Sequence, residues 1–230
     1  MYALSILLFQ GAQTAAEEEG AKQNLISIIT SGGPIAIAIF AVLLLLSIMA
    51  VYIFIERYLT IKRAARVDQN FMNNIRAAVT SGNIEGAKAL CKTTNTPIAR
   101  MVEKGLQRIG KPLRDIDAAI ENVGNLEIFK LEKGLSTLAS ISGAAPMIGF
   151  FGTVTGMILA FYTMATAENV GPAQLAGGIY QALTTTAFGL LIGIVSFVGY
   201  NMLVASVDKV VFKMEASTVE FMDLLQEPSN

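Results

Sequence analysis

The sequence contains no histidine and no tryptophan, and it has a single cysteine among its 230 residues. Without histidine, the common ligand sets for zinc and haem are absent, and Cys91 has no disulfide partner within the chain. We therefore expect no metal and no cofactor, and we expect Cys91 to be a structural residue. The chain also lacks a phosphate-binding glycine loop and a nucleophile with a histidine base, which argues against an enzyme.

Three long stretches of the chain contain no charged residue: Gln23 to Ile55, Gly134 to Ala167 and Asn169 to Val207. An ionised side chain at the centre of a bilayer is costly, so uncharged runs of this length are typical of membrane-spanning helices. The sequence predicts an all-α integral membrane protein with three transmembrane helices. Because none of these stretches contains Asp, Glu, Lys, Arg or His, ion chemistry within the membrane requires a charged group from another chain.

The distribution of charge predicts the orientation in the membrane. Between Glu56 and Lys133 there are 14 Lys or Arg residues against 9 Asp or Glu, whereas only Lys22 is basic before the first span. Basic residues near span ends favour the cytoplasmic side, so we expect residues 56 to about 135 in the cytoplasm and the N-terminus outside. The basic excess is small and interspersed with acidic residues, which argues against nucleic-acid binding.

The expected organisation has seven parts. The extreme N-terminus, with an apolar run from Leu4 to Phe9, weakly resembles a signal peptide but lacks a basic first region, so its cleavage stays open. The parts are an outer N-terminal segment at 1–24, a first transmembrane helix at 25–56, a cytoplasmic helical segment at 57–133, a second transmembrane helix at 134–167, an outer turn at 168–173, a third transmembrane helix at 174–204 and a cytoplasmic C-terminal helix at 205–230.

The cytoplasmic segment should consist of helices joined by tight turns. Asn83 and Thr96 are candidate N-caps, and Pro97 suits the first position of a helix. After the break at Gly110 to Pro112, helical periodicity continues from Leu113 through about Thr166, a length of about 80 Å that would extend far into the cytoplasm. The third helix should likewise extend far into the cytoplasm. Its tail carries an apolar stripe, expected to pack on the helix before the second span: Val207, Val210, Val211, Met214, Val219 and Met222.

The second and third spans are rich in small and hydroxyl residues. At helical spacing, Gly149 and Thr153 share one face of the second span, and Thr186 and Gly189 share one face of the third. Such a face is either a close packing seam or the lining of a channel, and the spacing leaves both open. Pro146 predicts a kink, which either widens a vestibule or serves packing. The residues expected to pack in this region are Pro146, Gly149, Gly152, Gly156, Gly189 and Gly193.

Two segments resemble known signatures. Residues 145–157, APMIGFFGTVTGM, resemble the second-span signature of the MotA/TolQ/ExbB proton-channel family, and residues 178–190, GIYQALTTTAFGL, resemble its third-span signature. The order of the spans and the long cytoplasmic segment also match. The chain is most similar to the ExbB branch of this family.

The resemblance implies a subunit of a homo-oligomeric ring, a pentamer, in the bacterial inner membrane, with its N-terminus periplasmic and its C-terminus cytoplasmic. The ring would contact membrane lipid and surround an ExbD-like single-span partner that carries a membrane Asp, and would use the proton-motive force to energise a TonB-like protein for outer-membrane transport. Thr153 and Thr186 match the family's pore threonines. Gln181 stands where ExbB and TolQ commonly have Glu; it cannot titrate, so it either orients the partner or water, or is an interfacial polar residue.

Other functions stay open at this point. Within the family, the chain could be a TolQ-like or MotA-like stator of a related motor. Outside it, small-residue helices could merely assemble a non-conducting membrane scaffold, which would need no titrating partner. A secondary transporter fits less well, because the sequence has only three spans and no inverted repeat.

Overall fold

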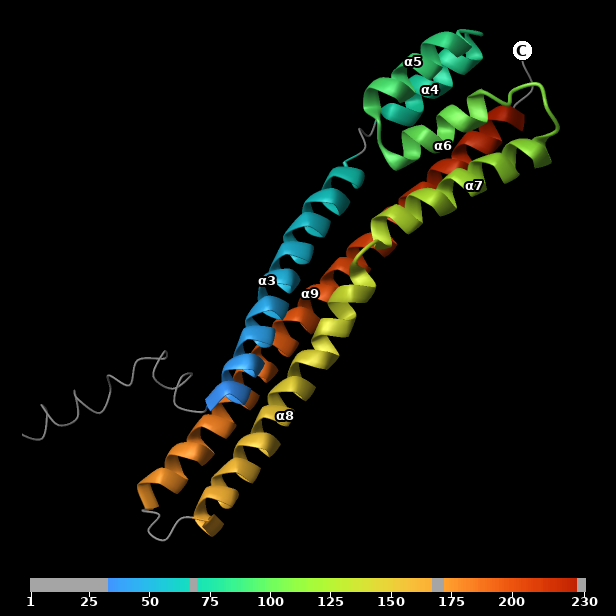
Figure 1. Ribbon diagram of the computed structural model, residues 1–230. Helices are drawn as coiled ribbons and strands as arrows, with labels where there is room; N and C mark the ends of the chain where they lie inside the picture. The colour runs from blue at the N-terminus through green and yellow to red at the C-terminus, as the bar shows by residue number, and fades with distance from the viewer. Residues whose placement is uncertain (1–32, 67–69, 167–171, 227–230) are drawn as a thin grey trace, which may run out of the picture. The chain divides into compact units, whose positions relative to one another are not determined.

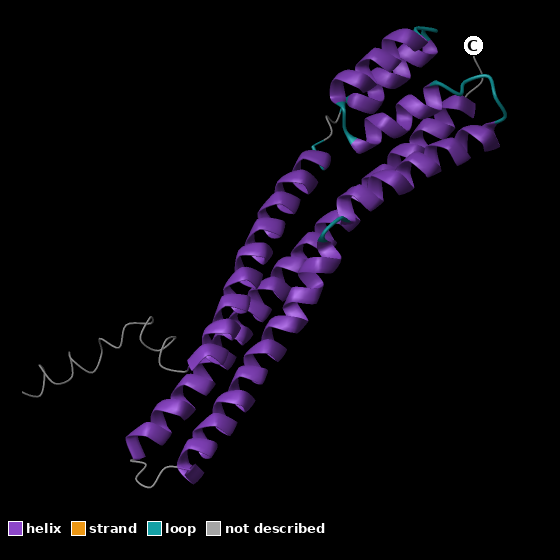
Figure 2. Ribbon diagram, in the orientation of Figure 1, coloured by secondary structure: helices purple, strands orange, loops and turns teal. Residues whose placement is uncertain are grey.

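The computed structural model describes residues 33–66, 70–166 and 172–226, which form helices joined by short turns, with no strand among them (Figure 2). Three helices in this part of the chain are long and apolar enough to cross a membrane, so the protein is an all-α membrane protein, as predicted. The predicted outer segment at 1–24 and residues 168–171 of the predicted outer turn lie outside the described residues. The three long helices are α3 (Gly33–Ala64), α8 (Leu135–Thr166) and α9 (Pro172–Gln226).

The chain divides into two compact units, which are described separately. Unit 1 contains the described residues 33–48, 142–166 and 172–194. Unit 2 contains the described residues 49–66, 70–141 and 195–226. The uncharged parts of α8 and α9 therefore meet in unit 1, and most of the charged residues lie in unit 2.

Unit 1 packs the beginning of α3 against α8 and α9, which lie side by side (Figure 1). Its small core is built around Leu43, which is 1% exposed, together with Ile39 and Ala145. Phe40 meets Phe188 edge to face, with ring centroids 5.7 Å apart. The opposite faces of the three helices expose large apolar side chains, as a surface in contact with lipid or with other membrane helices requires.

Unit 2 contains four shorter helices whose ends follow local sequence signals. Asn83 caps one helix by accepting a hydrogen bond from the Gly86 amide at 2.9 Å, and Thr96 caps the next by accepting from the Ala99 amide at 3.3 Å. Both predicted caps are confirmed, as is the position of Pro97 at a helix start. The helices are α4 (Phe71–Thr80), α5 (Ile84–Thr94), α6 (Pro97–Leu106) and α7 (Leu113–Glu132).

The C-terminal part of α9 completes the core of unit 2, running beside α6 and α7 (Figure 1). Val207, Val210 and Met214 of the predicted stripe are buried, at 1–2% exposure. The prediction for Val219 is wrong, because this side chain is 60% exposed. Phe221, which the stripe omitted, is fully buried instead. Its ring lies so close to Gly105 of α6 that a Cβ atom built there would come within 2.4 Å of it.

The structure corrects the single long helix expected from Leu113 through Thr166. The helix ends at Glu132 and a new one begins at Leu135. Lys133 between them has an extended backbone (φ −51°, ψ 128°), and Gly134 has φ +83°, a conformation that favours glycine. The prediction failed because it looked for proline as the helix breaker, whereas the break depends on one glycine with a left-handed backbone.

Cys91 lies in the core of unit 2 at 1% exposure, in agreement with a structural role. Burial, with a smaller effect of the negative charge of Glu103, raises the pKa of its thiol to about 12. Because the thiolate is the reactive form, we expect the folded protein to resist alkylation by iodoacetamide at pH 8, and to react once unfolded in denaturant. Rapid labelling of the folded protein would contradict this buried position.

Candidate functional site

Glycines bring the backbones of α8 and α9 together in unit 1. A Cβ atom built at Gly189 would lie 2.6 Å from the Ala145 carbonyl oxygen and 2.9 Å from the Gly149 Cα. One built at Gly149 would lie 2.8 Å from the Thr185 carbonyl oxygen. These neighbours are backbone atoms, which cannot rotate away as a side chain can, so the two helices approach too closely for any larger residue. We call this contact the α8–α9 seam.

The other predicted packing residues also lie along the α8–α9 seam. Gly193 faces the ring of Pro146, with a built Cβ only 2.4 Å from the Pro146 Cγ. Gly152 faces the Thr185 side chain, and Gly156 faces the Ala182 Cβ. Pro146 lies inside α8, which continues through it, so its ring fills the space that Gly193 leaves open.

Thr153 and Thr186 face each other across the α8–α9 seam. Their hydroxyl oxygens are in hydrogen-bond contact, the Thr153 hydroxyl also lies 3.1 Å from the Ala182 carbonyl oxygen, and the Thr186 hydroxyl lies 3.0 Å from the Gly149 carbonyl oxygen. Each hydroxyl has only one proton, so the pair has two protons for three contacts. Only two of the three hydrogen bonds can therefore form at a time. Either Thr153 donates to Thr186 while Thr186 donates to Gly149, or Thr186 donates to Thr153 while Thr153 donates to Ala182, and exchange between these two states reverses the bond between the hydroxyls.

The structure does not bring Gln181 to the threonine pair. Gln181 and Thr186 are five positions apart on α9, so their side chains point about 140° apart. Gln181 is 7% exposed and lines a separate cavity, and its amide nitrogen has no hydrogen-bond partner within the described part of the chain. Within the described residues the Gln181 side chain thus lies in this cavity rather than at the threonine pair, and its pore-lining role stays a prediction.

The α8–α9 seam carries hydroxyl groups but no ionisable acid or base. Residues 142–166 and 172–194, which form the α8 and α9 parts of unit 1, contain no Asp, Glu, Lys, Arg or His. Among the described residues there is also no group of three His, Cys, Asp or Glu that could hold a metal ion. The hydroxyl groups of the seam can donate and accept hydrogen bonds and can pass a proton between the groups bonded to them. The seam has no titrating side chain of its own that could bind the proton.

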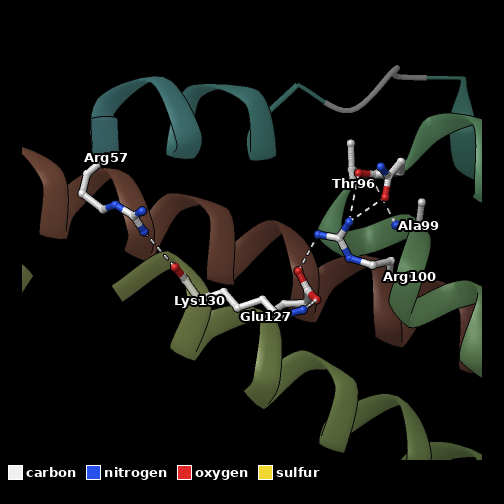
Figure 3. Close-up of polar contacts among 7 residues, drawn as sticks. Arg57, Thr96, Ala99, Arg100, Glu127 and Lys130 are labelled. Atoms are coloured by element: carbon white, nitrogen blue, oxygen red, sulfur yellow. Dashed lines mark hydrogen bonds and ion pairs between the residues drawn. The ribbon is translucent and has the colours of Figure 1, made fainter. Parts of the chain in front are cut away.

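A second polar feature, the charged cluster of unit 2, surrounds a buried carboxylate (Figure 3). Glu127 of α7 is only 3% exposed; it accepts hydrogen bonds from Arg100 of α6 at 2.5 Å and from Lys130 at 2.7 Å. Arg100 also donates to the side chain of Asn95 at 2.7 Å. Arg57 of α3, itself buried, donates to the Lys130 carbonyl oxygen at 3.0 Å. The cluster therefore connects α3, α6 and α7.

The environment of Glu127 makes the stability of unit 2 depend on pH. Burial raises the pKa of its carboxyl group, but the hydrogen bonds and positive charges of Arg100 and Lys130 outweigh burial and hold that pKa below its ordinary value. The ionised form is thus favoured by folding. This stabilisation is complete above the pKa of glutamate in an unfolded chain, about 4.3, and is lost as the pH falls through the lower folded value.

We expect Glu127→Gln to lower the free energy of unfolding by about 1–3 kcal/mol at pH 7, because two charge-assisted hydrogen bonds are weakened. The difference from the wild type should shrink as the pH falls below about 4.3. Thermal unfolding of the full chain in mild detergent over this pH range measures it, and the exposed Glu121→Gln provides the matched control. A difference between wild type and Glu127→Gln that stayed constant with pH would contradict the role of the ionised carboxylate.

Two parts of these sites escaped the sequence analysis. Thr185 is 1% exposed and contacts the carbonyl oxygens of Ala182 and Gly149 at 2.7 and 3.3 Å, but within a run of three threonines its position gave no signal. The pair of Arg100 and Glu127 joins residues 27 positions apart. A buried charge in an amphipathic helix could have been found from its position on the apolar face of α7.

Comparison with known proteins gives a consistent result. The sequence pattern of the MotA/TolQ/ExbB proton channel family matches residues 93–216. Biopolymer transport protein ExbB of Neisseria meningitidis is 26% identical over 194 residues, which cover 78% of this chain and 87% of the relative. An ExbB homolog of Methanothermobacter thermautotrophicus is 32% identical over 135 residues, covering 58% of this chain but only 47% of the relative. Tol-Pal system protein TolQ of Pseudomonas aeruginosa is 33% identical over 122 residues, covering 50% and 53%.

Proposed function

Since the chain belongs to the MotA/TolQ/ExbB proton channel family, we propose that it is the ring subunit of a proton-driven motor in the bacterial inner membrane. The match includes both halves of the α8–α9 seam, where Thr153 and Thr186 form their pair. The observation that carries the proposal is this pair of facing hydroxyls in a seam without ionisable residues. Such a site can guide a proton, but the proton must be held by a carboxylate from another chain.

The proposed mechanism assigns the titrating group to a partner. Thr153 and Thr186 would line the pore of a pentameric ring, and an Asp on the transmembrane helix of an ExbD-like protein would take up and release the proton beside them. Each hydroxyl can donate to an ionised carboxylate and accept from a protonated one. Because the threonine pair has more acceptors than protons, a change in the charge of the carboxylate would reorient the hydroxyls of the pair.

The proposed orientation places unit 2 in the cytoplasm. The basic residues that follow the first span support it, since Arg57, Lys62 and Arg63 lie in the last two turns of α3. In this orientation the N-terminus is periplasmic and the C-terminal end of α9 is cytoplasmic. Work would be delivered to a TonB-like protein in the periplasm, in support of transport across the outer membrane.

A TolQ-like role is the second candidate, because a TolQ protein matches this chain at 33% identity. Both roles share the ring, the membrane Asp of the partner and the use of the proton-motive force. They differ in the protein to which work is delivered. Identification of the periplasmic protein that copurifies with the complex separates an ExbB-like motor from a TolQ-like one.

The proposed function is tested by weighing the complex intact after extraction in mild detergent, with every subunit identified by mass spectrometry. We expect several copies of this chain together with a smaller protein that has one transmembrane helix with an Asp inside it. A homo-oligomer without such a partner would leave the proton without a titrating group. That outcome would overturn the motor and favour a membrane scaffold.

A further inference from the structure

Unit 1 contains a cavity of about 470 Å³ beside the α8–α9 seam. Its wall is formed by the first residues of α3, by the second half of α8 and by the beginning of α9. The wall includes no charged side chain, and its polar side chains are those of Gln181, Thr155, Thr163 and Thr185. We call this space the Gln181 cavity. Its size allows several water molecules, and because most of its wall is apolar, they would be held by these four polar side chains.

Gln181 supplies a hydrogen-bond donor for which the described part of the chain offers no acceptor. The residue is 7% exposed, it lines the cavity, and its Nε2 atom has no acceptor within the described residues. A buried polar group without a partner costs about 1–3 kcal/mol. A hydrogen-bond acceptor inside the cavity would therefore stabilise the Gln181 amide.

The threonines of the cavity supply acceptors. The hydroxyls of Thr155, Thr163 and Thr185 each donate to a carbonyl oxygen of their own helix, at 2.9, 2.9 and 2.7 Å. Their protons are thus engaged, while lone pairs on the hydroxyl oxygens are left to accept. A wall with an unused amide donor, several acceptors and no charge fits water, which both accepts and donates, better than it fits an ion.

Thr185 belongs to both the Gln181 cavity and the α8–α9 seam. Its hydroxyl contacts the carbonyl oxygens of Ala182 at 2.7 Å and of Gly149 at 3.3 Å. The same Ala182 oxygen accepts from Thr153 at 3.1 Å, and the same Gly149 oxygen accepts from Thr186 at 3.0 Å. Thr185 therefore shares one carbonyl acceptor with Thr153 and another with Thr186, so a change in the hydrogen bonding of Thr185 alters the acceptors open to the threonine pair.

We propose that the Gln181 cavity binds water, held between the Gln181 amide and the threonine hydroxyls, and that Thr185 couples this water to the Thr153–Thr186 pair. Gln181 and Thr185 act here as positioning residues. The proposal that water binds in this cavity depends only on the geometry of the cavity. The effect of Thr185 on proton passage rests on the proposed function. The two steps therefore need separate measurements.

Water in the cavity is tested by NMR on the complex in lipid, with ¹⁵N-labelled glutamine. The side-chain amide of Gln181 is assigned by the signal that disappears in Gln181→Met, and magnetisation transfer from water to this amide is measured. We expect a water cross-peak. If the amide shows none, because a lipid chain or a neighbouring subunit fills the cavity, the water site is overturned.

The coupling through Thr185 is tested by proton flux in proteoliposomes that contain the complex. Thr185→Val keeps the shape of the side chain but removes the hydroxyl, and we expect proton flux to fall by about tenfold, because a buried hydrogen-bonding link is lost. Thr185→Ser restores the hydroxyl and should restore the flux. Thr184→Val is the matched control, since the Thr184 hydroxyl donates to the Tyr180 carbonyl oxygen of its own helix, at 2.8 Å, and has no contact across the α8–α9 seam among the described residues.

The outcomes separate the two claims. Equal flux in Thr185→Val and Thr185→Ser would overturn the coupling through Thr185. A wild-type complex that conducts no protons, but shows the water cross-peak at Gln181, would contradict the proposed function and support the water site. A Thr185→Val complex that is assembled, conducts poorly and is rescued by serine would support the coupling.

Discussion

Replacing Gly189 with alanine should separate α8 from α9 and prevent a stable assembly. The added methyl group would come within 2.6 Å of the Ala145 carbonyl oxygen and 2.9 Å of the Gly149 Cα, so a backbone must move. Overpacking in a close-packed interior costs about 1–3 kcal/mol, and the loss of the neighbouring hydrogen bonds across the seam adds to it. We expect a marked fall in the thermal unfolding temperature and in the yield of assembled complex in mild detergent.

Gly143→Ala is the matched control for Gly189→Ala. Gly143 lies in α8 as well, but a Cβ atom built there meets no heavy atom within 4 Å. Alanine also favours helix over glycine, by about 1 kcal/mol, so this change should leave stability unchanged or raise it slightly. A Gly189→Ala protein as stable and as well assembled as Gly143→Ala would show that the seam is not closed as described.

Removing the hydroxyl of Thr186 or of Thr153 should abolish proton-driven activity while leaving the fold intact. Valine has nearly the shape of threonine, so packing is retained. The Gly149 and Ala182 carbonyl oxygens lie within α8 and α9 and each accept the backbone N–H four residues further along the helix, so neither is left without a donor. We expect Thr186→Val and Thr153→Val to assemble with normal stability. Proton flux in proteoliposomes should fall by more than about tenfold, because the hydroxyl proposed to lie beside the partner's carboxylate is lost.

Serine at the same positions tests whether the hydroxyl is the group that matters. Thr186→Ser and Thr153→Ser keep the hydroxyl and lose only a methyl group, so most of the flux should return. If both valine variants conduct protons like the wild type, the role proposed for the threonine pair is wrong. If the valine variants fail to assemble, the pair is needed for packing rather than for conduction, which would also overturn the role.

The features that the sequence predicted correctly depend on neighbouring residues. The caps at Asn83 and Thr96 are confirmed because a capping side chain bonds an amide only three positions away. The three apolar helices are confirmed because the absence of charge over a long run leaves few alternatives to a membrane span. Cys91 is buried, in agreement with the structural role expected of it.

Other features could not be predicted because they depend on distant parts of the chain or on one backbone angle. The Glu127 ion pair with Arg100 forms only after α6 and α7 pack together. Val219 continues the apolar spacing of the α9 tail but is exposed. Phe221 is buried because its ring packs where Gly105 of α6 has no side chain. The signatures around Thr153 and Thr186 predicted which residues matter, but not that Thr185 would share their carbonyl acceptors.

The break at Gly134 has a mechanical consequence. An α-helix resists torsion because each turn is bonded to the next, and α9 is continuous for 55 residues. The α7–α8 connection lacks this ladder at Lys133 and Gly134, and Arg57 holds the Lys130 carbonyl oxygen just before it. We therefore expect the backbone to twist more easily at Lys133 and Gly134 than at any position within α9, so that the start of α8 can rotate there while Arg57 restrains the end of α7.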